Sequence, residues 1–263
     1  SGINGIEYAE IAVFDGSKCV FRGIVDEQVE TISESGIILE INARSLAALL
    51  LDNEAMPQSC CLPDMQLFME RNFSRLGFKE YIGNDKPKSG SMSIAKGESE
   101  WSVLEKYCRK FLDTYPRVNE IDISENEGET TVLTNEGEHK IISLSRVRKR
   151  CELISEYRVR TLRGNGYEMI INNENAERLG VDSVRYLNAV DNGGVGIASC
   201  YQNIKESNEL YDTLNLTISG RVLVNIGDWI VLPDYKLGNL RVNKLRYEAD
   251  GDNELTILNL LCN

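Results

Sequence analysis

The sequence predicts an α+β fold that is rich in β-strands. Alternating apolar residues, which are typical of half-buried strands, run through residues 7–30 and through most of the last 50 residues. Apolar residues at helical spacing occur only in short stretches between these strand-rich segments. A chain of 263 residues can hold one large domain or two ordinary ones. The strands therefore define the fold class, and the helices are expected to lie between them.

Residues 7–30 predict a β-hairpin. The segment EIAVF alternates, Asp15-Gly16 is a typical hairpin turn, and KCVFRGIVDE is the returning strand.

The spacing of apolar residues changes just after this hairpin. Residues 37–41 alternate as a strand, and residues 43–52 place leucines at helical spacing. Asn42 is expected to cap this helix, and Asn53 and Pro57 to end it. A strand that turns directly into a short apolar helix, with no catalytic residue at the joint, is typical of a scaffold.

Two further helices are predicted in the first half of the chain. One runs from Asp64 to Leu76 and stops at Gly77. The other begins near Ser99, after a short strand at 92–95, and carries an apolar stripe before Pro116.

The second half of the chain predicts mainly strands. Residues 117–134 resemble a short acidic β-meander, and residues 141–163 a basic strand region. Two weaker helices are expected around 175–179 and 198–211. The final segments, LNLTISG, RVLVNIGDWIVLPD, LRVNKLRYEA and ELTILNLL, predict four or five strands joined by tight turns. They indicate a small barrel or sandwich.

Composition and charge exclude several classes of protein. A net charge of −12 argues against a general nucleic-acid binder and against docking on anionic lipid. The longest apolar run, residues 46–51, is far shorter than the roughly 20 residues of a membrane-spanning helix. The start of the chain has no signal peptide, and its Ser-Gly opening indicates a trimmed N-terminus.

The charges are unevenly distributed along the chain. Residues 119–138 carry seven acids and no Lys or Arg, whereas residues 141–163 carry seven bases against two acids. Either these are two solvated faces, or they are complementary patches that meet between subunits. On the second interpretation the candidate interface residues are Arg146, Arg148, Arg150, Arg158, Arg160, Glu125, Glu127 and Glu129.

The sequence shows no strong signal for catalysis, a metal or a cofactor. Seven cysteines without a CxxC pair and a single histidine, His139, do not match zinc-ligand spacing, and they fit reduced thiols. His139 is expected in a surface loop. The glycine run 193–196 follows no clear strand and is not expected to bind phosphate. Trp101 and Trp229 are both expected in the core.

A carbohydrate-binding or glycoside-hydrolase module directed at the cell wall remains the alternative. Its candidate carboxylates are the pairs Asp26/Glu27 and Glu98/Glu100 and the cluster 120–129. Among 41 acids, close pairs also arise by chance.

Four segments together resemble the baseplate hub proteins of contractile phage tails. These are the late-control-D and Mu-like tail proteins, which are related to the hub region of type VI spike proteins. The segments are EIAVFDGSKCVFRGIVDE, EINARSLAALLLDNEAMP, SMSIAKGESEWSVLEKYCRK, and LNLTISGRVLVNIGDWIVL with the closing TILNLL. In the second segment Arg44, Ser45 and Asp52 fit the family pattern, and Ala43 stands where glycine is common.

The resemblance implies a structural, non-enzymatic protein without cofactors. It implies two tube-like β-barrel or sandwich domains with an α/β insertion, in which residues 1–42 and 141–170 form the first tube-like domain. Residues 43–140 would form the insertion, and 171–263 the second β domain. It further implies a homotrimeric ring in the baseplate of a virion or phage-like particle, with the tail tube protein, the spike protein and other baseplate proteins as partners. We expect an acidic lumen and a basic 146–163 region that faces a neighbouring subunit.

Overall fold

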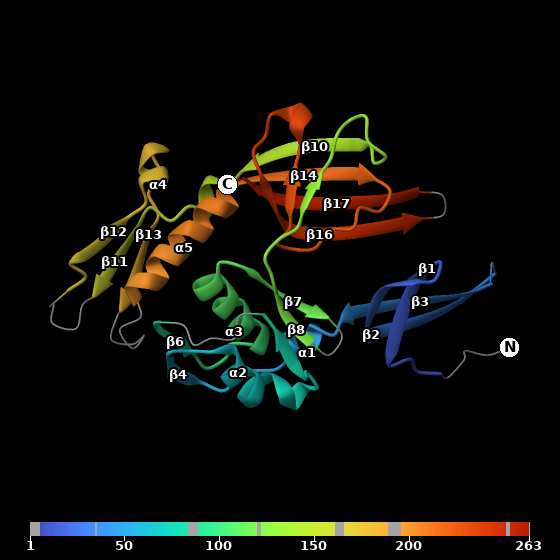
Figure 1. Cartoon of the computed structure of the whole chain (residues 1–263), viewed down its shortest axis with the longest axis horizontal. Coiled ribbons are helices and arrows are strands. Elements are labelled where there is room, and N and C mark those ends of the chain that lie inside the picture. Colours follow the sequence, from blue (N-terminus) through green and yellow to red (C-terminus); the bar gives the residue numbers. More distant parts are fainter. Residues whose placement is uncertain are drawn as a thin grey trace. The chain divides into compact units, whose positions relative to one another are not determined.

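The computed structural model describes residues 6–34, 36–83, 89–119, 122–160, 166–188, 196–250 and 253–262. The chain is β-rich with interspersed helices, which confirms the predicted α+β class (Figure 1). It divides into two compact units. The first contains residues 1–90, 94–111 and 116–125, and the second contains 91–93, 112–115 and 126–263.

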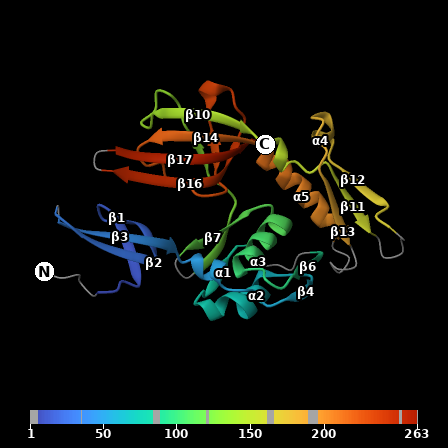
Figure 2. The same ribbon diagram turned by 180° about the vertical axis from the view of Figure 1, so that it is seen from behind.

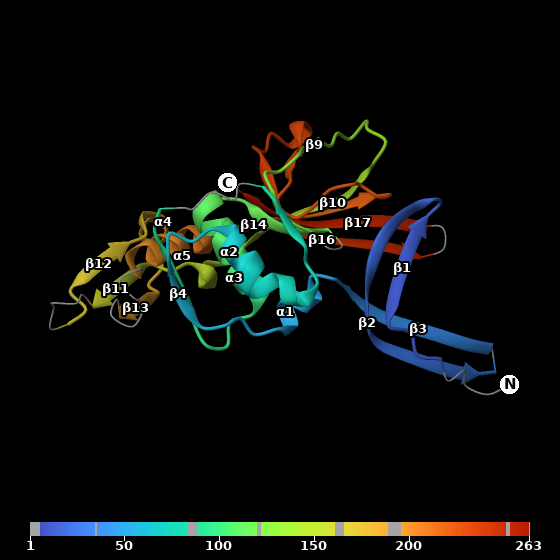
Figure 3. The same ribbon diagram turned by 60° about the horizontal axis from the view of Figure 1, so that its bottom comes forward.

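The first unit begins with an antiparallel sheet in the order β1-β2-β3 (Figure 3). Strand β1 (Glu10–Asp15) pairs with β2 (Lys18–Ser33), and the turn between them contains Gly16 at φ 56°. The predicted hairpin is therefore confirmed. Strand β3 (Gly36–Ser45) pairs with the far part of β2, and a bulge interrupts this ladder between Val25 and Glu27.

The predicted helix at 43–52 begins later than expected, and the predicted cap at Asn42 is wrong. Strand β3 continues to Ser45, and helix α1 covers only Ala48–Asp52, with no side-chain cap. Asn42 lies within the β2–β3 ladder, where its Nδ2 donates to Glu27 Oε2 at 2.9 Å. Pairing with β2 thus extends the strand past the point at which the local sequence changes period.

The helices of the first unit follow the sequence closely. Helix α2 (Met65–Phe68) continues through a π-turn (Met69–Phe73) and a 3-10 turn (Ser74–Leu76) to Gly77, whose φ is 96°. Helix α3 (Glu100–Tyr107) begins at Ser99, whose side chain accepts from Ser102 N, and it runs into a π-turn (Cys108–Leu112). Phe68 and Tyr107 are fully buried, and their rings meet edge to face at 5.8 Å.

Five short strands accompany these helices. They are β4 (Gln58–Cys61), β5 (Glu80–Ile82), β6 (Ser91–Ile94), β7 (Tyr115–Asn119) and β8 (Asp122–Asn126). Strands β5, β8 and β7 form one small sheet, in which β5 and β8 run parallel.

The second unit is built on a six-stranded sheet in the order β10-β14-β17-β16-β15-β9. Figure 2 shows β10, β14, β17 and β16 side by side. Its strands are β9 (Thr130–Val132), β10 (Ile141–Arg148), β14 (Asp212–Ser219), β15 (Trp229–Val231), β16 (Leu240–Asp250) and β17 (Asn253–Cys262). A 3-10 turn (Pro233–Tyr235) follows β15. The predicted small barrel or sandwich is thus a single sheet that curls around its own core.

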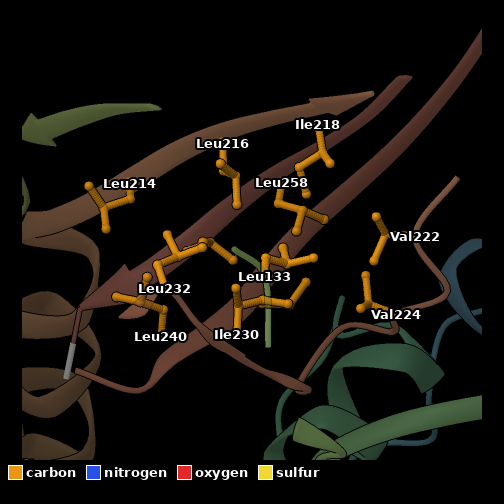
Figure 4. Close-up of a cluster of buried hydrophobic side chains, with 12 residues drawn as sticks. Leu133, Leu214, Leu216, Ile218, Val222, Val224, Ile230, Leu232, Leu240 and Leu258 are labelled. Carbon is orange, nitrogen blue, oxygen red and sulfur yellow. The ribbon is translucent and has the colours of Figure 1, made fainter. Parts of the chain in front are cut away.

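The buried residues of this core cluster are aliphatic, and along β14, β16 and β17 they occur at every second position. Figure 4 shows these side chains converging from the strands and from the 222–224 segment. The cluster contains Leu133, Leu214, Leu216, Ile218, Val222, Val224, Ile230, Leu232, Leu240, Val242, Leu258 and Leu260.

A smaller layer of the second unit combines a sheet with helix α5. Strands β12 (Met169–Asn172), β11 (Glu156–Arg160) and β13 (Val184–Asn188) lie in that order, and α5 (Gly196–Tyr211) contributes Cys200 and Ile204 to a core with Tyr157, Val159 and Ile171. A short helix α4 (Glu174–Arg178) and a 3-10 turn (Arg150–Glu152) complete the layer. The predicted helices around 175–179 and 198–211 are confirmed.

The predicted domain boundaries stay a prediction. Strand β10 falls in the first predicted tube-like domain and β14 in the second predicted β domain. The two strands pair from Ile141↔Ile218 to Arg148↔Asp212.

Candidate assembly surfaces

Two of the predicted basic residues tie β10 to β14. Arg146 donates from Nε and Nη2 to the two carboxylate oxygens of Asp212, at 2.7 and 2.6 Å, and Arg148 Nε lies 3.4 Å from the same carboxylate. The hydrogen bonds from Arg146, followed by the positive charges of both arginines, hold the pKa of Asp212 below its usual range. Arg146 and Arg148 are therefore partly neutralised within their own chain.

The remaining predicted bases differ in their availability. Arg158 on β11 donates to Glu156 at 2.6 Å, which raises the pKa of Arg158 above its ordinary value. Arg150 lies in an exposed 3-10 turn, and Arg160 is exposed at the end of β11. Within the described ranges neither makes an ion pair, so these two can offer their charge to a partner.

The predicted acidic residues divide between the two units. Glu125, on β8 in the first unit, is half-buried and accepts from the hydroxyl of Tyr81 at 3.2 Å. Burial, followed by the nearby negative groups, raises the pKa of Tyr81 above its ordinary value. Glu127 and Glu129 belong to the second unit and are exposed on either side of Gly128. Of the three predicted acids, Glu127 and Glu129 are exposed and Glu125 is not.

A buried carboxylate fixes the segment that carries Glu127 and Glu129. Asp228, which is 3% exposed, accepts from Asn126 Nδ2 at 3.0 Å and from the backbone N–H groups of Glu129 and Asn225 at 3.1 and 2.6 Å. Asn126 also donates to the carbonyl of Ile226 at 2.7 Å. The Gly-Asp of the predicted barrel motif thus holds the 126–129 segment against the 225–228 turn.

Trp229 is half-buried against a cation rather than inside the aliphatic core. The guanidinium of Arg241 lies 4.5 Å from the ring centre of Tyr115 and 5.1 Å from that of Trp229. It also donates to the carbonyls of Gly227 and Asp113, both at 3.3 Å. Trp229 was predicted in the core. It is instead half-buried and makes a cation–π contact with Arg241.

The β1–β3 sheet carries an apolar face that the sequence analysis did not identify. Residues paired across an antiparallel ladder point to the same side, so the registers of β1, β2 and β3 place eight large apolar side chains on one face. We call this the apolar face; its members are Ile11, Val13, Phe21, Val25, Ile32, Ile37, Leu39 and Ile41. None of them is buried. The alternation was visible in the sequence, but the exposure of these side chains was not.

The opposite face of the same sheet carries charged side chains around Arg44 together with the apolar Ile24, Val29 and Ile38. The Arg44 guanidinium donates to both oxygens of Asp26, at 2.6 and 2.8 Å, and to both oxygens of Asp52, at 2.9 and 2.7 Å. The pKa values of Asp26 and Asp52 are lowered, first by these hydrogen bonds, and the pKa of Arg44 is raised by them. Two of the family-like motifs therefore meet in one ionic cluster.

The carboxylates of the two pairs considered for glycoside hydrolysis, Asp26/Glu27 and Glu98/Glu100, are engaged within the chain. Asp26 is paired with Arg44 and Glu27 with Asn42, while Glu98 binds Lys106 at 2.6 Å. Glu100 is 1% exposed and accepts from Asn72 and Arg75, both at 2.8 Å.

The other sequence-predicted positions are as follows. Among the described residues no three His, Cys, Asp or Glu side chains group as metal ligands, and all seven cysteines are free thiols. His139 is half-buried beside the carbonyl of Ser219. Part of the glycine run 193–196 lies outside the described residues. In the part of the chain that the structure describes, no helix has the length and apolarity to cross a membrane.

Comparisons with known proteins identify the fold. No protein-family model and no curated protein matches the sequence. The 43 kDa tail protein of prophage MuSo2 from Shewanella oneidensis matches 100% of this chain over 83% of its own length, with a TM-score of 0.69 and 14% identity. The tail protein of Neisseria meningitidis MC58 matches 95% of the chain over 82% of its own length, with a TM-score of 0.67 and 16% identity.

A secretion-system protein shares the same architecture. The Escherichia coli c3393 protein, a component of the type VI secretion system described as similar to T4 tail proteins gp27 and gp5, matches 96% of this chain over 63% of its own length. Its TM-score is 0.51 and its identity 10%. The chain therefore has the fold of prophage tail proteins, as its motifs predicted.

Proposed function

We propose that this protein is a structural component of the baseplate hub of a phage or phage-like contractile tail. In this role three copies form a ring that joins the tail tube to the spike. The observation that carries the proposal is that the whole chain, rather than one module of it, has the fold of the prophage tail proteins.

A ring is the physical form that such a role requires. A tail tube with one symmetry and a spike with another are joined by a closed assembly of heterologous contacts. At −12 for each chain, three copies carry a formal charge of −36. We propose that the acidic side chains, including Glu127 and Glu129, face the bore and keep DNA or cargo from adhering.

The basic residues are assigned to the contacts between subunits. Arg150 and Arg160 are exposed and make no ion pair among the described residues, so they can meet acids of a neighbouring copy. Arg146, Arg148 and Arg158 add positive potential, although each also has a partner within its own chain. Glu125 accepts from Tyr81 within its own chain, so we propose that it stabilises the first unit.

The proposal is tested on assembled particles. Deletion of the gene in a strain that produces the tail should abolish complete tails, and complementation with a tagged chain should restore them. Cryo-electron microscopy of the restored particles should place the tag between tube and spike with threefold symmetry. Complete tails from the deletion strain, or a tag found elsewhere on the particle, would overturn the assignment.

A further inference from the structure

Helices α4 and α5 line a cavity of about 560 Å³ in the second unit. Asn175 and Arg178 reach it from α4, and Tyr201, Ile204 and Asn208 reach it from α5. A cavity of this size with several convergent polar groups is typical of a binding site. None of these five side chains belongs to the charged surfaces described above.

Three asparagines beside this cavity form a hydrogen-bond network whose orientation is fixed at both ends. At one end Asn173 Nδ2 donates at 2.8 Å to the carbonyl of Ile154, a group that can only accept. At the other end Arg178, which can only donate, binds Asn175 Oδ1 at 2.8 Å. Between them Asn208 Oδ1 accepts from Nδ2 of Asn173 and of Asn175, at 3.0 and 3.1 Å. No amide of the network can therefore be reversed without the loss of a hydrogen bond.

This network uses up acceptors and leaves donors. Asn173 and Asn208 already accept two hydrogen bonds each at Oδ1. Asn175 and Asn208 each keep one N–H of Nδ2 for a further partner. Arg178 has five N–H groups, of which the described residues engage one, and it makes no ion pair with any of them. A ligand of this cavity therefore has to present acceptors.

The other charges at the cavity favour an acceptor with a single negative charge. Glu209 and Asp212 also line it. Asp212 is paired with Arg146, and Lys205 is paired with Asp113 at 2.7 Å. Because carboxylates already lie on the walls, a doubly charged phosphate is disfavoured by repulsion. A carboxylate carries one charge, and a single guanidinium can bind both of its oxygens.

The length and the walls of the cavity suit a peptide. On α5 the lining extends from Tyr201 to Tyr211, which is about 15 Å at 1.5 Å per residue and matches about four residues of extended chain. Ile204 is 8% exposed and Tyr201 is 59% exposed, so the wall offers both a buried apolar floor and an aromatic ring that is open to a partner. Tyrosines of this kind are frequent anchors of protein contacts.

We propose that this cavity binds the C-terminal residues of a partner protein in an extended conformation. The free terminal carboxylate is held by Arg178, and the preceding backbone carbonyls accept from the free amide N–H groups of Asn175 and Asn208. Tyr201 packs against a side chain of the bound segment. Capture of a C-terminal carboxylate by convergent donors is a known mode of peptide recognition. This inference goes beyond the proposed function and does not depend on the ring.

The test uses the purified full chain on a solid support and two pools of random hexapeptides. The pools differ only at the C-terminus, which is a free carboxylate in one and an amide in the other. The chain should retain peptides from the first pool and none from the second. A retained peptide is then labelled with fluorescein at its N-terminus and titrated by fluorescence anisotropy. Its amidated form should bind about tenfold or more weakly, because the charge-assisted hydrogen bonds are lost.

Variants of the chain locate the carboxylate. Arg178→Gln should weaken binding of the free-acid peptide about tenfold and leave the weak binding of the amidated form unchanged, which a merely structural role of Arg178 would not do. The control Arg185→Gln alters an exposed arginine of β13 that makes no ion pair within the described ranges, and it should bind both peptides as the wild type does. Circular dichroism verifies that the variants are folded.

A second pair of variants tests the aromatic wall. Tyr201→Ala should weaken binding of both forms of the peptide, because it removes contact area and not the carboxylate site. Tyr186→Ala makes the same change at a tyrosine of β13 that is 60% exposed and outside the cavity lining, and it should have no effect.

Three outcomes overturn the inference. If neither pool is retained, the cavity takes no peptide. If the free-acid and amidated peptides bind equally, the carboxylate is not recognised. If Arg178→Gln and Arg185→Gln have the same effect, any peptide binds elsewhere on the chain. None of these results bears on the place of the protein in the tail, so the proposed function is judged separately.

Discussion

The guanidinium of Arg44 on β3 donates two hydrogen bonds to the carboxylate of Asp26 on β2, at 2.6 and 2.8 Å. The same guanidinium holds Asp52 at the end of α1. Because the three residues come from a strand, its partner strand and the following helix, the cluster fixes the direction in which the chain leaves the sheet. Ser45 and the short α1 continue from this point.

The first prediction is that the Arg44 cluster stabilises the protein only above acidic pH. The pKa values of Asp26 and Asp52 are lowered from 3.8, so their contribution is present above the unfolded pKa and is lost as the pH falls through the folded values. Arg44→Met should lower the melting temperature slightly at pH 7, since exposed ion pairs contribute little. Once the pH falls below the lowered pKa values of Asp26 and Asp52, the variant and the wild type should melt together.

Thermal unfolding followed by circular dichroism from pH 7 to pH 2 checks this. Arg22→Met is the matched control. Arg22 lies on β2, and its exposed ion pair with Glu10 is longer, at 3.8 Å, so the loss of this pair should have a smaller effect at pH 7. A difference between Arg44→Met and wild type that persists unchanged at pH 2 would contradict the role of the carboxylates.

The second prediction concerns Asp228. Asp228→Ala leaves Asn126 and two backbone N–H groups without their acceptor in a buried site, and each orphaned donor costs about 1–3 kcal/mol. The free energy of unfolding of the second unit should therefore fall by at least about 2 kcal/mol. Urea denaturation, followed by the fluorescence of Trp229 in a Trp101→Phe chain, measures it.

Asp234→Ala is the control for that experiment. Asp234 also accepts a backbone N–H, from Asn135 at 2.7 Å, but at an exposed site where water can replace it. Its loss should change stability by no more than about 0.5 kcal/mol. Equal losses for the two variants would show that Asp228 does not act through burial.

The sequence analysis succeeded where local pattern decides structure and failed where distant contacts decide it. The Asp15-Gly16 turn and the Ser99 cap were predicted because each is specified within a few residues. The end of β3 was not, because pairing with β2 overrides the helical spacing after Asn42.

The candidate surfaces show the same division. The charged segments were visible as composition, so Arg150 and Arg160 could be proposed from the sequence as interface residues, and they stay a prediction. The link between Arg44 and Asp26 spans 18 residues and required the strand register. The exposure of the apolar face could not be predicted from the sequence, because a covered and an uncovered sheet show the same alternation of apolar residues.

The third prediction compares a fully buried carboxylate with a half-buried one two residues away. Glu100 accepts from Asn72 and Arg75 in the core of the first unit, so Glu100→Ala should lower the free energy of unfolding by about 1–3 kcal/mol. Glu98→Ala removes a half-buried carboxylate, 22% exposed, that pairs with the 44% exposed Lys106, and it should cost about 0–1 kcal/mol. Urea denaturation, followed by the fluorescence of Trp101 in a Trp229→Phe chain, distinguishes them. A larger effect at Glu98 would contradict the structure.

The fourth prediction tests the core of the six-stranded sheet. Leu216 on β14 is fully buried among the aliphatic side chains in Figure 4, so Leu216→Ala removes buried methyl groups and leaves a cavity. Substitutions of this kind cost about 2–5 kcal/mol. Leu223→Ala makes the same chemical change at a side chain that is 61% exposed, where the cost should stay near 0.5 kcal/mol. Trp229 fluorescence in the Trp101→Phe chain reports both. If Leu223→Ala were as destabilising as Leu216→Ala, then Leu223 would be buried in solution, and the 222–224 segment would have to be covered by another copy.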